Sequence, residues 1–169
     1  MKIAFILHNL SFLGGTQRLV LNLARTAKKQ GYQVKVYTLA VDREHTYPNL
    51  LEGLDVIALA DRDPDALRLA HGAKFLGLFS RPNYLIYWQW RNRIFKKLAL
   101  LIDADTELLC PVGFHAYVAA HYFKKIKNDI PSVYLLLTFP LKGWLLWRAG
   151  EVNSAFRLSP LKQFCYWCM

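Results

Sequence analysis

The chain has 169 residues, of which 54% are hydrophobic and 20% are charged, and this composition excludes an intrinsically disordered protein. The length is sufficient for one domain with a sizeable core. The formal net charge of +10 favours an anionic partner, which phosphates, acidic lipid or nucleic acid would all satisfy.

The N-terminal forty residues carry the most informative pattern. Residues 2–7 are almost continuously apolar, which predicts a strand that is covered on both faces. Gly14 and Gly15 then allow a sharp turn and a close approach to a ligand. Residues 16–30 show the apolar spacing of an amphipathic helix, and Gly31 is a suitable end for it. A helix N-terminus that follows a strand and two glycines predicts a phosphate cradle in a nucleotide-handling α/β domain.

The next elements predict a parallel sheet. Residues 33–39 alternate as a second strand, so the strand, helix and strand form a right-handed crossover. Residues 42–53 predict a loop and residues 55–59 a short third strand. A helix over residues 66–79 follows, for which Asp63 is a suitable cap and Pro64 a suitable first residue.

Residues 84–102 predict a helix that carries both aromatic and basic side chains. Such a mixture suits a membrane–water interface, and the predicted membrane-facing residues are Trp90, Arg91, Arg93, Lys96 and Lys97. The alternative is an ordinary packed helix with a solvated charged face. Interleaved aromatic and basic residues can also bind nucleic acid, but no recognised nucleic-acid module accompanies them, so we expect no nucleic-acid partner.

The last predicted elements place candidate ligand-binding residues at one edge of the sheet. Residues 103–113 predict a fourth strand with its entry, residues 114–127 a helix that bears lysines, and residues 132–137 a fifth strand. Ligands of open parallel sheets bind beyond the carboxyl ends of the strands, where His8, Gly113 and His115 are expected. His115 is the candidate catalytic or acceptor-side group. For both histidines, a structural role is the alternative.

The phrase Gly14-Gly15-Thr16-Gln17-Arg18, followed by a Leu/Val-rich helix and the segment 31–38, resembles the opening of family 4 glycosyltransferases of the GT-B fold. Those proteins typically have a Gly-Gly-x-Glu-Arg turn, and this chain has Gln17 at the glutamate position. A weaker likeness covers residues 103–140. There, Val112 occupies the position of a frequent histidine, and Thr138-Phe139-Pro140 stands where relatives have a polar pair.

The resemblance implies a doubly wound, Rossmann-like domain over residues 1–150, equivalent to the acceptor-side half of a GT-B enzyme, and an irregular, truncated or frameshifted tail over 151–169. The implied reaction transfers a sugar from a nucleotide-sugar to a hydroxyl or lipid-linked acceptor, without a metal or other cofactor. Gly14, Gly15 and Thr16 would bind the donor diphosphate. His8, Asn9 and Gly113 would lie on the acceptor side.

The resemblance also implies a partner. The paired glutamates of the family's donor-binding domain have no counterpart here, so a separate C-terminal half is expected and little transfer by this chain alone. The alternative is a non-catalytic binding or membrane-docking module. A dinucleotide-dependent oxidoreductase is disfavoured, because the glycine spacing is wrong.

The remaining sequence features concern location and cysteine chemistry. No apolar run reaches membrane-spanning length, and the first residues lack a signal-peptide cleavage site. Three cysteines form no disulfide framework, so a cytoplasmic protein is expected, with peripheral attachment to the inner membrane face as a further expectation. The terminal Cys165-x-x-Cys168 pair is too few ligands for a zinc site, and no metal is predicted.

Overall fold

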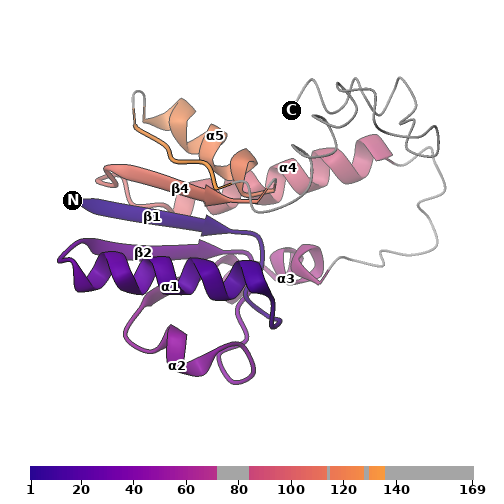
Figure 1. The fold of residues 1–169 in the computed structure, drawn as a ribbon. Helices are drawn as coiled ribbons and strands as arrows, with labels where there is room; N and C mark the ends of the chain where they lie inside the picture. The colour runs from indigo at the N-terminus through magenta and orange to yellow at the C-terminus, as the bar shows by residue number, and fades with distance from the viewer. Residues whose placement is uncertain (72–83, 114, 128–129, 136–169) are drawn as a thin grey trace, which may run out of the picture. The chain divides into compact units, whose positions relative to one another are not determined.

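The computed structural model describes residues 1–71, 84–113, 115–127 and 130–135 (Figure 1). Several predictions concern residues outside these ranges: residues 72–79 of the predicted 66–79 helix, the end of the fifth strand, and the tail with its two cysteines.

The sheet has four parallel strands in the order β3-β2-β1-β4. They are β1 (Lys2–Leu7), β2 (Gln33–Thr38), β3 (Asp55–Ala58) and β4 (Leu108–Val112). Beyond β4, residues 132–135 continue the sheet through two isolated parallel bridges, at Ser132 and Leu135. An all-parallel sheet flanked by helices confirms the predicted α/β, Rossmann-like fold class.

The helices connect the strands as the sequence predicts, with local differences. They are α1 (Gly15–Lys29), α2 (Pro48–Leu51), η1 (Leu59–Asp61), α3 (Pro64–Ala70), α4 (Tyr84–Leu101) and α5 (Ala116–Ile126). The predicted loop 42–53 was wrong in part, because it contains the short helix α2. Pro48 stands in the first turn of α2, where its missing N–H leaves no hydrogen bond unmade.

Two hydrophobic cores lie on the two faces of the sheet, and β1 contributes alternate residues to each. Ile3, Phe5 and Leu7 pack with α1, whereas Ala4 and Ile6 pack with α3, α4 and α5. Figure 1 shows α1 on one side of the sheet and α4 with α5 on the other. Because successive side chains of a strand point to opposite faces, the residue after Leu7 should point towards α4 and α5.

Two chain turns that shape the sheet edges need a left-handed backbone. Gly31 has φ +86° and ends α1 in a Schellman motif, in which Tyr32 N donates to Ala27 O and Gly31 N to Lys28 O. Gly113 has φ +75° and turns the chain from β4 towards α5. The predicted stop at Gly31 is therefore confirmed.

Asp63 caps α3 as predicted. Its carboxylate accepts a hydrogen bond from Asp65 N at 3.0 Å, and Pro64 occupies the first turn. The same carboxylate pairs with the Lys97 ammonium of α4. This ion pair is the main cause that lowers the pKa of Asp63.

Candidate functional site

Two histidines meet at the point where the strand order reverses. β1 runs to β2 on one side and lies beside β4 on the other, so the carboxyl ends of β1 and β4 form the topological switch point of the sheet. His8 follows β1 directly, and His115 lies at the start of α5 after β4. Their ring centroids are 4.8 Å apart. The structure thus brings together His8, Gly113 and His115, as their placement in sequence predicts.

Phe95 of α4 completes the wall behind the two histidines. Its ring centroid lies 5.9 Å from that of His8 and 6.2 Å from that of His115. Phe95 is fully buried, and both histidines are partly buried. The imidazoles therefore lie on the α4 and α5 side of the sheet, as the alternation along β1 requires.

Burial keeps both histidines neutral. It is the largest cause that lowers the pKa of His8 to about 4, and Arg91 adds to the shift. The pKa of His115 falls to about 3 through burial, then through His8 and Arg91. A neutral imidazole offers one N–H donor and one acceptor nitrogen, which suits a sugar hydroxyl. An efficient general base has a pKa near the working pH, so this environment favours positioning of a hydroxyl over proton abstraction.

Arg91 is where the prediction for α4 was wrong. It was expected to face a membrane, but it is only 5% exposed. It lies one turn before Phe95, on the same helix face as the core residues Ile94, Phe95 and Leu98. Trp90 also packs partly against this core.

The other predicted membrane-facing residues have different surroundings. Arg93 and Lys96 are exposed, whereas Lys97 is partly buried beside Asp63. Within the described ranges, no helix combines the length and the apolarity needed to cross a membrane.

The double glycine begins α1, but its two members differ. Gly14 has φ −158°, an extended backbone that any residue adopts, so its conformation does not require glycine. A Cβ at Gly14 would overlap the Gln17 side chain, which is buried and donates to Asn9 O at 3.2 Å. A Cβ at Gly15 would meet nothing within 4 Å.

The expectation that both glycines serve the turn was therefore wrong. Gly14 leaves room for the Gln17 amide, and Gly15 leaves open space where α1 begins. No side chain caps this helix end, and Thr16 lies in its first turn. The first N–H groups of α1 thus remain available to an anion.

The Asn9 side chain has a structural role that the sequence did not indicate. Its side-chain amide donates to Ala70 O at 2.7 Å, and its Oδ1 accepts from Ser11 N at 2.8 Å. Asn9 is 4% exposed. It joins the end of α3 to the loop after β1 and so positions the edge beside His8.

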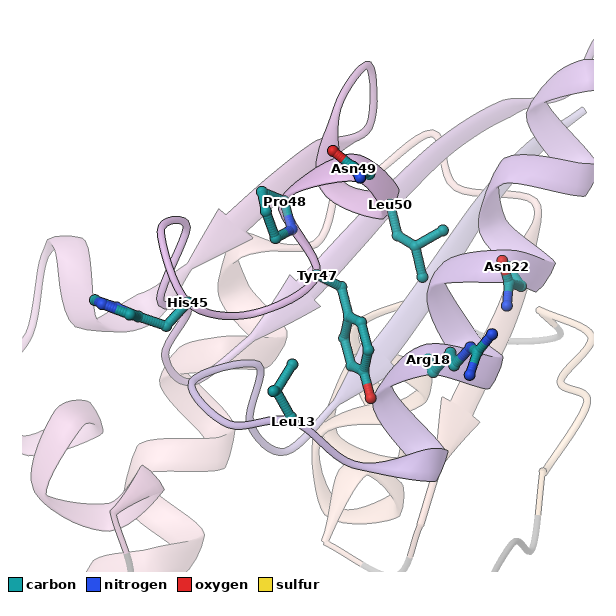
Figure 2. Close-up of a pocket in the computed structure, with 8 residues that line it drawn as sticks. All are labelled: Leu13, Arg18, Asn22, His45, Tyr47, Pro48, Asn49 and Leu50. Atoms are coloured by element: carbon teal, nitrogen blue, oxygen red, sulfur yellow. The ribbon is translucent and has the colours of Figure 1, made fainter.

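A pocket that the sequence did not indicate lies between α1 and residues 45–50, which include the start of α2. Its volume is about 570 Å³, and its lining residues are Leu13, Arg18, Asn22, His45, Tyr47, Pro48, Asn49 and Leu50. Figure 2 shows the Tyr47 ring pointing towards the start of α1, with Leu13 beside it, and Arg18 and Asn22 on the helix.

Tyr47 ties this pocket to the double glycine. Its hydroxyl donates to Gly14 O at 3.3 Å, and its backbone is left-handed, with φ 43° and ψ 57°. This conformation is unusual for a bulky residue. The sequence of the predicted loop 42–53 indicates neither this conformation nor the contact with Gly14, so Tyr47 was not predicted as a site residue.

Among the described residues, no group of three or more His, Cys, Asp or Glu side chains could hold a metal ion. The one cysteine described, Cys110, is buried in β4, and burial raises the pKa of its thiol to about 11.

Comparisons with protein-family models, curated proteins and solved structures found no match to this chain.

Proposed function

We propose that the described domain is the acceptor-side half of a GT-B glycosyltransferase of family 4. It would act with a separate donor-binding half and transfer a sugar from a nucleotide-sugar to a hydroxyl of the acceptor. The observation that carries this proposal is the His8–His115 pair, 4.8 Å apart at the switch point of the sheet. The motif around Gly14 and Gly15 supports the family assignment.

The described side chains suit two tasks in this reaction. The neutral imidazoles can each accept a hydrogen bond from an acceptor hydroxyl or donate one to its oxygen. The uncapped N-terminus of α1, with open space at Gly15, can approach the donor diphosphate. Its positive dipole end would stabilise the charge that develops on the nucleoside diphosphate as its bond to the sugar breaks. The sugar then bonds to the acceptor oxygen, and the proton of the acceptor hydroxyl passes to the departing phosphate oxygen.

The test is sugar transfer in extracts of the native cell, with a panel of nucleotide-sugars and variants introduced into the gene. We expect His8→Ala together with His115→Ala to reduce the rate of transfer at least about tenfold. That loss corresponds to about 1.4 kcal/mol, which the loss of one or two hydrogen bonds would account for. His121→Ala is the matched control, because His121 is exposed on α5. Unchanged transfer in the double variant would refute the acceptor role. Failure of the protein to bind any nucleotide-sugar in the presence of its partner half would refute the glycosyltransferase assignment.

A second candidate, a membrane-docking module, is favoured by one observation. Gln89, Arg93, Lys96 and Leu100 are exposed and lie within one stripe of α4, and Leu100 is 63% exposed. Basic residues beside an apolar side chain suit the surface of an acidic bilayer.

Vesicle sedimentation with neutral and acidic lipid tests this candidate. We expect binding to need acidic lipid and to be lost with Arg93→Glu and Lys96→Glu. The control is Lys28→Glu with Lys29→Glu, an equal charge change on the exposed end of α1. Equal loss in both double variants would show general electrostatic attraction and not docking through α4.

A further inference from the structure

The pocket beside α1 is open to solvent and is lined by a positively charged side chain. Its volume of about 570 Å³ lies within the range of small-molecule sites, about 300–1,000 Å³. The lining residues Leu13, Arg18 and Asn22 are exposed, so a ligand can reach them directly. The Arg18 side chain makes no hydrogen bond or ion pair with any of the described residues. Its guanidinium is therefore available to a ligand in this pocket.

Basic side chains further along α1 have a different role. The Arg25 guanidinium donates to Asn49 O, and the Lys28 ammonium donates to Gly53 O. These contacts attach the segment 49–53 to the helix. Arg18 lies about two turns before Arg25 on the same side of α1, and it lines the pocket instead of binding a backbone carbonyl.

The pocket also has an apolar wall that is held in place. Tyr47 has a left-handed backbone, with φ 43°, and its hydroxyl donates to Gly14 O at 3.3 Å. Tyr47 and Leu50 pack partly against the core on the α1 face of the sheet. Figure 2 shows the Tyr47 ring between Leu13 and Arg18. Leu13 is 64% exposed, so a ligand that covers it would remove apolar surface from water.

This combination of side chains matches one class of ligand. A guanidinium presents a planar fork of N–H groups that binds the oxygens of a phosphate or carboxylate in pairs. None of the described residues that line the pocket carries a carboxylate, and the exposed His45 is already paired with Asp42. The apolar wall suits an apolar or aromatic group, as in most small-molecule sites.

We propose that this pocket binds an organic anion, with its phosphate or carboxylate on Arg18 and its apolar body against Leu13 and Tyr47. The site is separate from the histidine pair. Tyr47 packs against the core on the α1 face of the sheet, whereas His8 and His115 contact Phe95 in the core on the other face. The proposal therefore does not rest on the glycosyltransferase assignment.

The test titrates the 169-residue protein with small probes and follows the side-chain amide resonances of Asn22 and Asn49, which line the pocket. Phenyl phosphate and benzoate carry both parts of the ligand, whereas inorganic phosphate and benzyl alcohol carry one part each. We expect saturable shifts with a complete probe and at least about tenfold weaker binding of the partial probes. The tighter complete probe identifies the anionic group. Equal affinity for phenyl phosphate and inorganic phosphate would overturn the proposal.

Two variants test the anionic half of the site. Arg18→Met should weaken binding of phenyl phosphate at least about tenfold, because it removes the charged donor. Lys29→Met is the matched control: it removes a positive charge about three turns further along the same side of α1 and should change affinity less than about twofold. Equal losses in these two variants would show attraction by net charge alone and would overturn the proposal.

Asn22→Asp keeps the test decisive if Arg18→Met alters folding. The substitution retains the shape of an exposed side chain and places a negative charge one turn from Arg18. It should weaken binding of phenyl phosphate at least about fivefold and leave the affinity for benzyl alcohol unchanged. Unchanged affinity for phenyl phosphate would contradict an anion bound at Arg18.

Leu13→Ser tests the apolar half. It should weaken binding of phenyl phosphate at least about fivefold and leave the affinity for inorganic phosphate unchanged, because the lost surface is apolar. Leu19→Ser is the matched control, since Leu19 is also exposed, at 40%, and is not one of the described residues that line the pocket. Equal losses in both variants would contradict an apolar wall at Leu13.

The histidine resonances separate this inference from the proposed function. We expect phenyl phosphate to leave the imidazoles of His8 and His115 unshifted, because they lie on the other face of the sheet. Shifts of these imidazoles without shifts of Asn22 would overturn the inference. Binding in the pocket without any sugar transfer would leave it standing and remove the glycosyltransferase assignment. Sugar transfer without binding of either complete probe would do the reverse.

Discussion

Lys97 of α4 forms an ion pair with Asp63, the residue that caps α3. The Asp63 side chain is only 13% exposed. Because it caps α3 and pairs with Lys97, it links α3 to α4. The pair supports the edge of the sheet where the histidines lie, because α3 is also held there by Asn9 through Ala70 O.

We expect Asp63→Ala to destabilise the protein by about 1–2 kcal/mol, because it removes both the cap and the ion pair. Asp63→Asn keeps a capping oxygen and loses only the charge, so it should cost less than about 1 kcal/mol. Urea unfolding measures both. Equal losses in the two variants would show that the cap contributes little.

Acid should destabilise the protein through His8 and His115. Their folded-state pKa values, about 4 and about 3, lie below the ordinary value of 6.5. The unfolded chain therefore binds protons that the folded protein does not, and stability is lost as the pH falls below 6.5 towards these folded values. The slope is at most about 1.4 kcal/mol per pH unit for each histidine.

Urea unfolding between about pH 7 and pH 5 measures this slope. The double variant His8→Gln with His115→Gln should show a smaller slope, whatever its absolute stability. His121→Gln should keep the wild-type slope, because His121 is exposed. A wild-type slope in the double variant would mean that other groups control acid stability.

The two glycines at the start of α1 should respond in opposite ways to alanine. Gly15→Ala meets open space and should be neutral or stabilising by up to about 1 kcal/mol. Gly14→Ala forces the Gln17 side chain to move and should destabilise by about 1–3 kcal/mol. A double-mutant cycle with Gln17→Ala checks the cause, since the cost of Gly14→Ala should shrink when the amide is gone. Additive effects would contradict the clash with Gln17.

Gly15→Ala also separates folding from ligand binding. If a diphosphate approaches the backbone at this position, the added methyl group should weaken nucleotide-sugar binding by the assembled protein while stability is kept. Isothermal titration gives the affinity. Unaltered affinity would show that the donor does not reach Gly15.

Gly113→Ala should displace His115 and cost about 1 kcal/mol or more, because Gly113 has φ +75°. Gly31→Ala is the matched control: Gly31 has φ +86°, but it lies at the opposite end of the sheet, after α1. Both variants should lose similar stability, and only Gly113→Ala should shift the imidazole resonances of His8. A shift of equal size in Gly31→Ala would contradict a local role for Gly113.

Much of the fold was predictable because its determinants are local. The apolar runs and alternation of β1, β2 and β3, the cap at Asp63 and the stop at Gly31 depend on residues only a few positions apart. The parallel pairing of β1 with β2 and of β2 with β3 also follows from local evidence, since short crossovers of one hand place consecutive strands side by side. The pairing of β4 with β1 joins strands that are not consecutive in the chain. The proximity of His8 to His115 was expected from that topology, and the structure confirmed it.

What only the tertiary structure decided is which side of each element faces inward. Helix α4 has apolar side chains on more than one side, so its sequence does not determine whether Trp90 or Arg91 faces the core. Packing against β1 and α5 buries Arg91 with Ile94 and Phe95. Tyr47 was equally hidden, because its hydroxyl contacts Gly14 O, which is 33 residues away in the sequence. The difference between Gly14 and Gly15 was hidden because it depends on the rotamer of the Gln17 side chain, which bonds to Asn9 O. Local periodicity determines the type of an element, whereas the packing of elements distant in sequence determines which of its residues form the site.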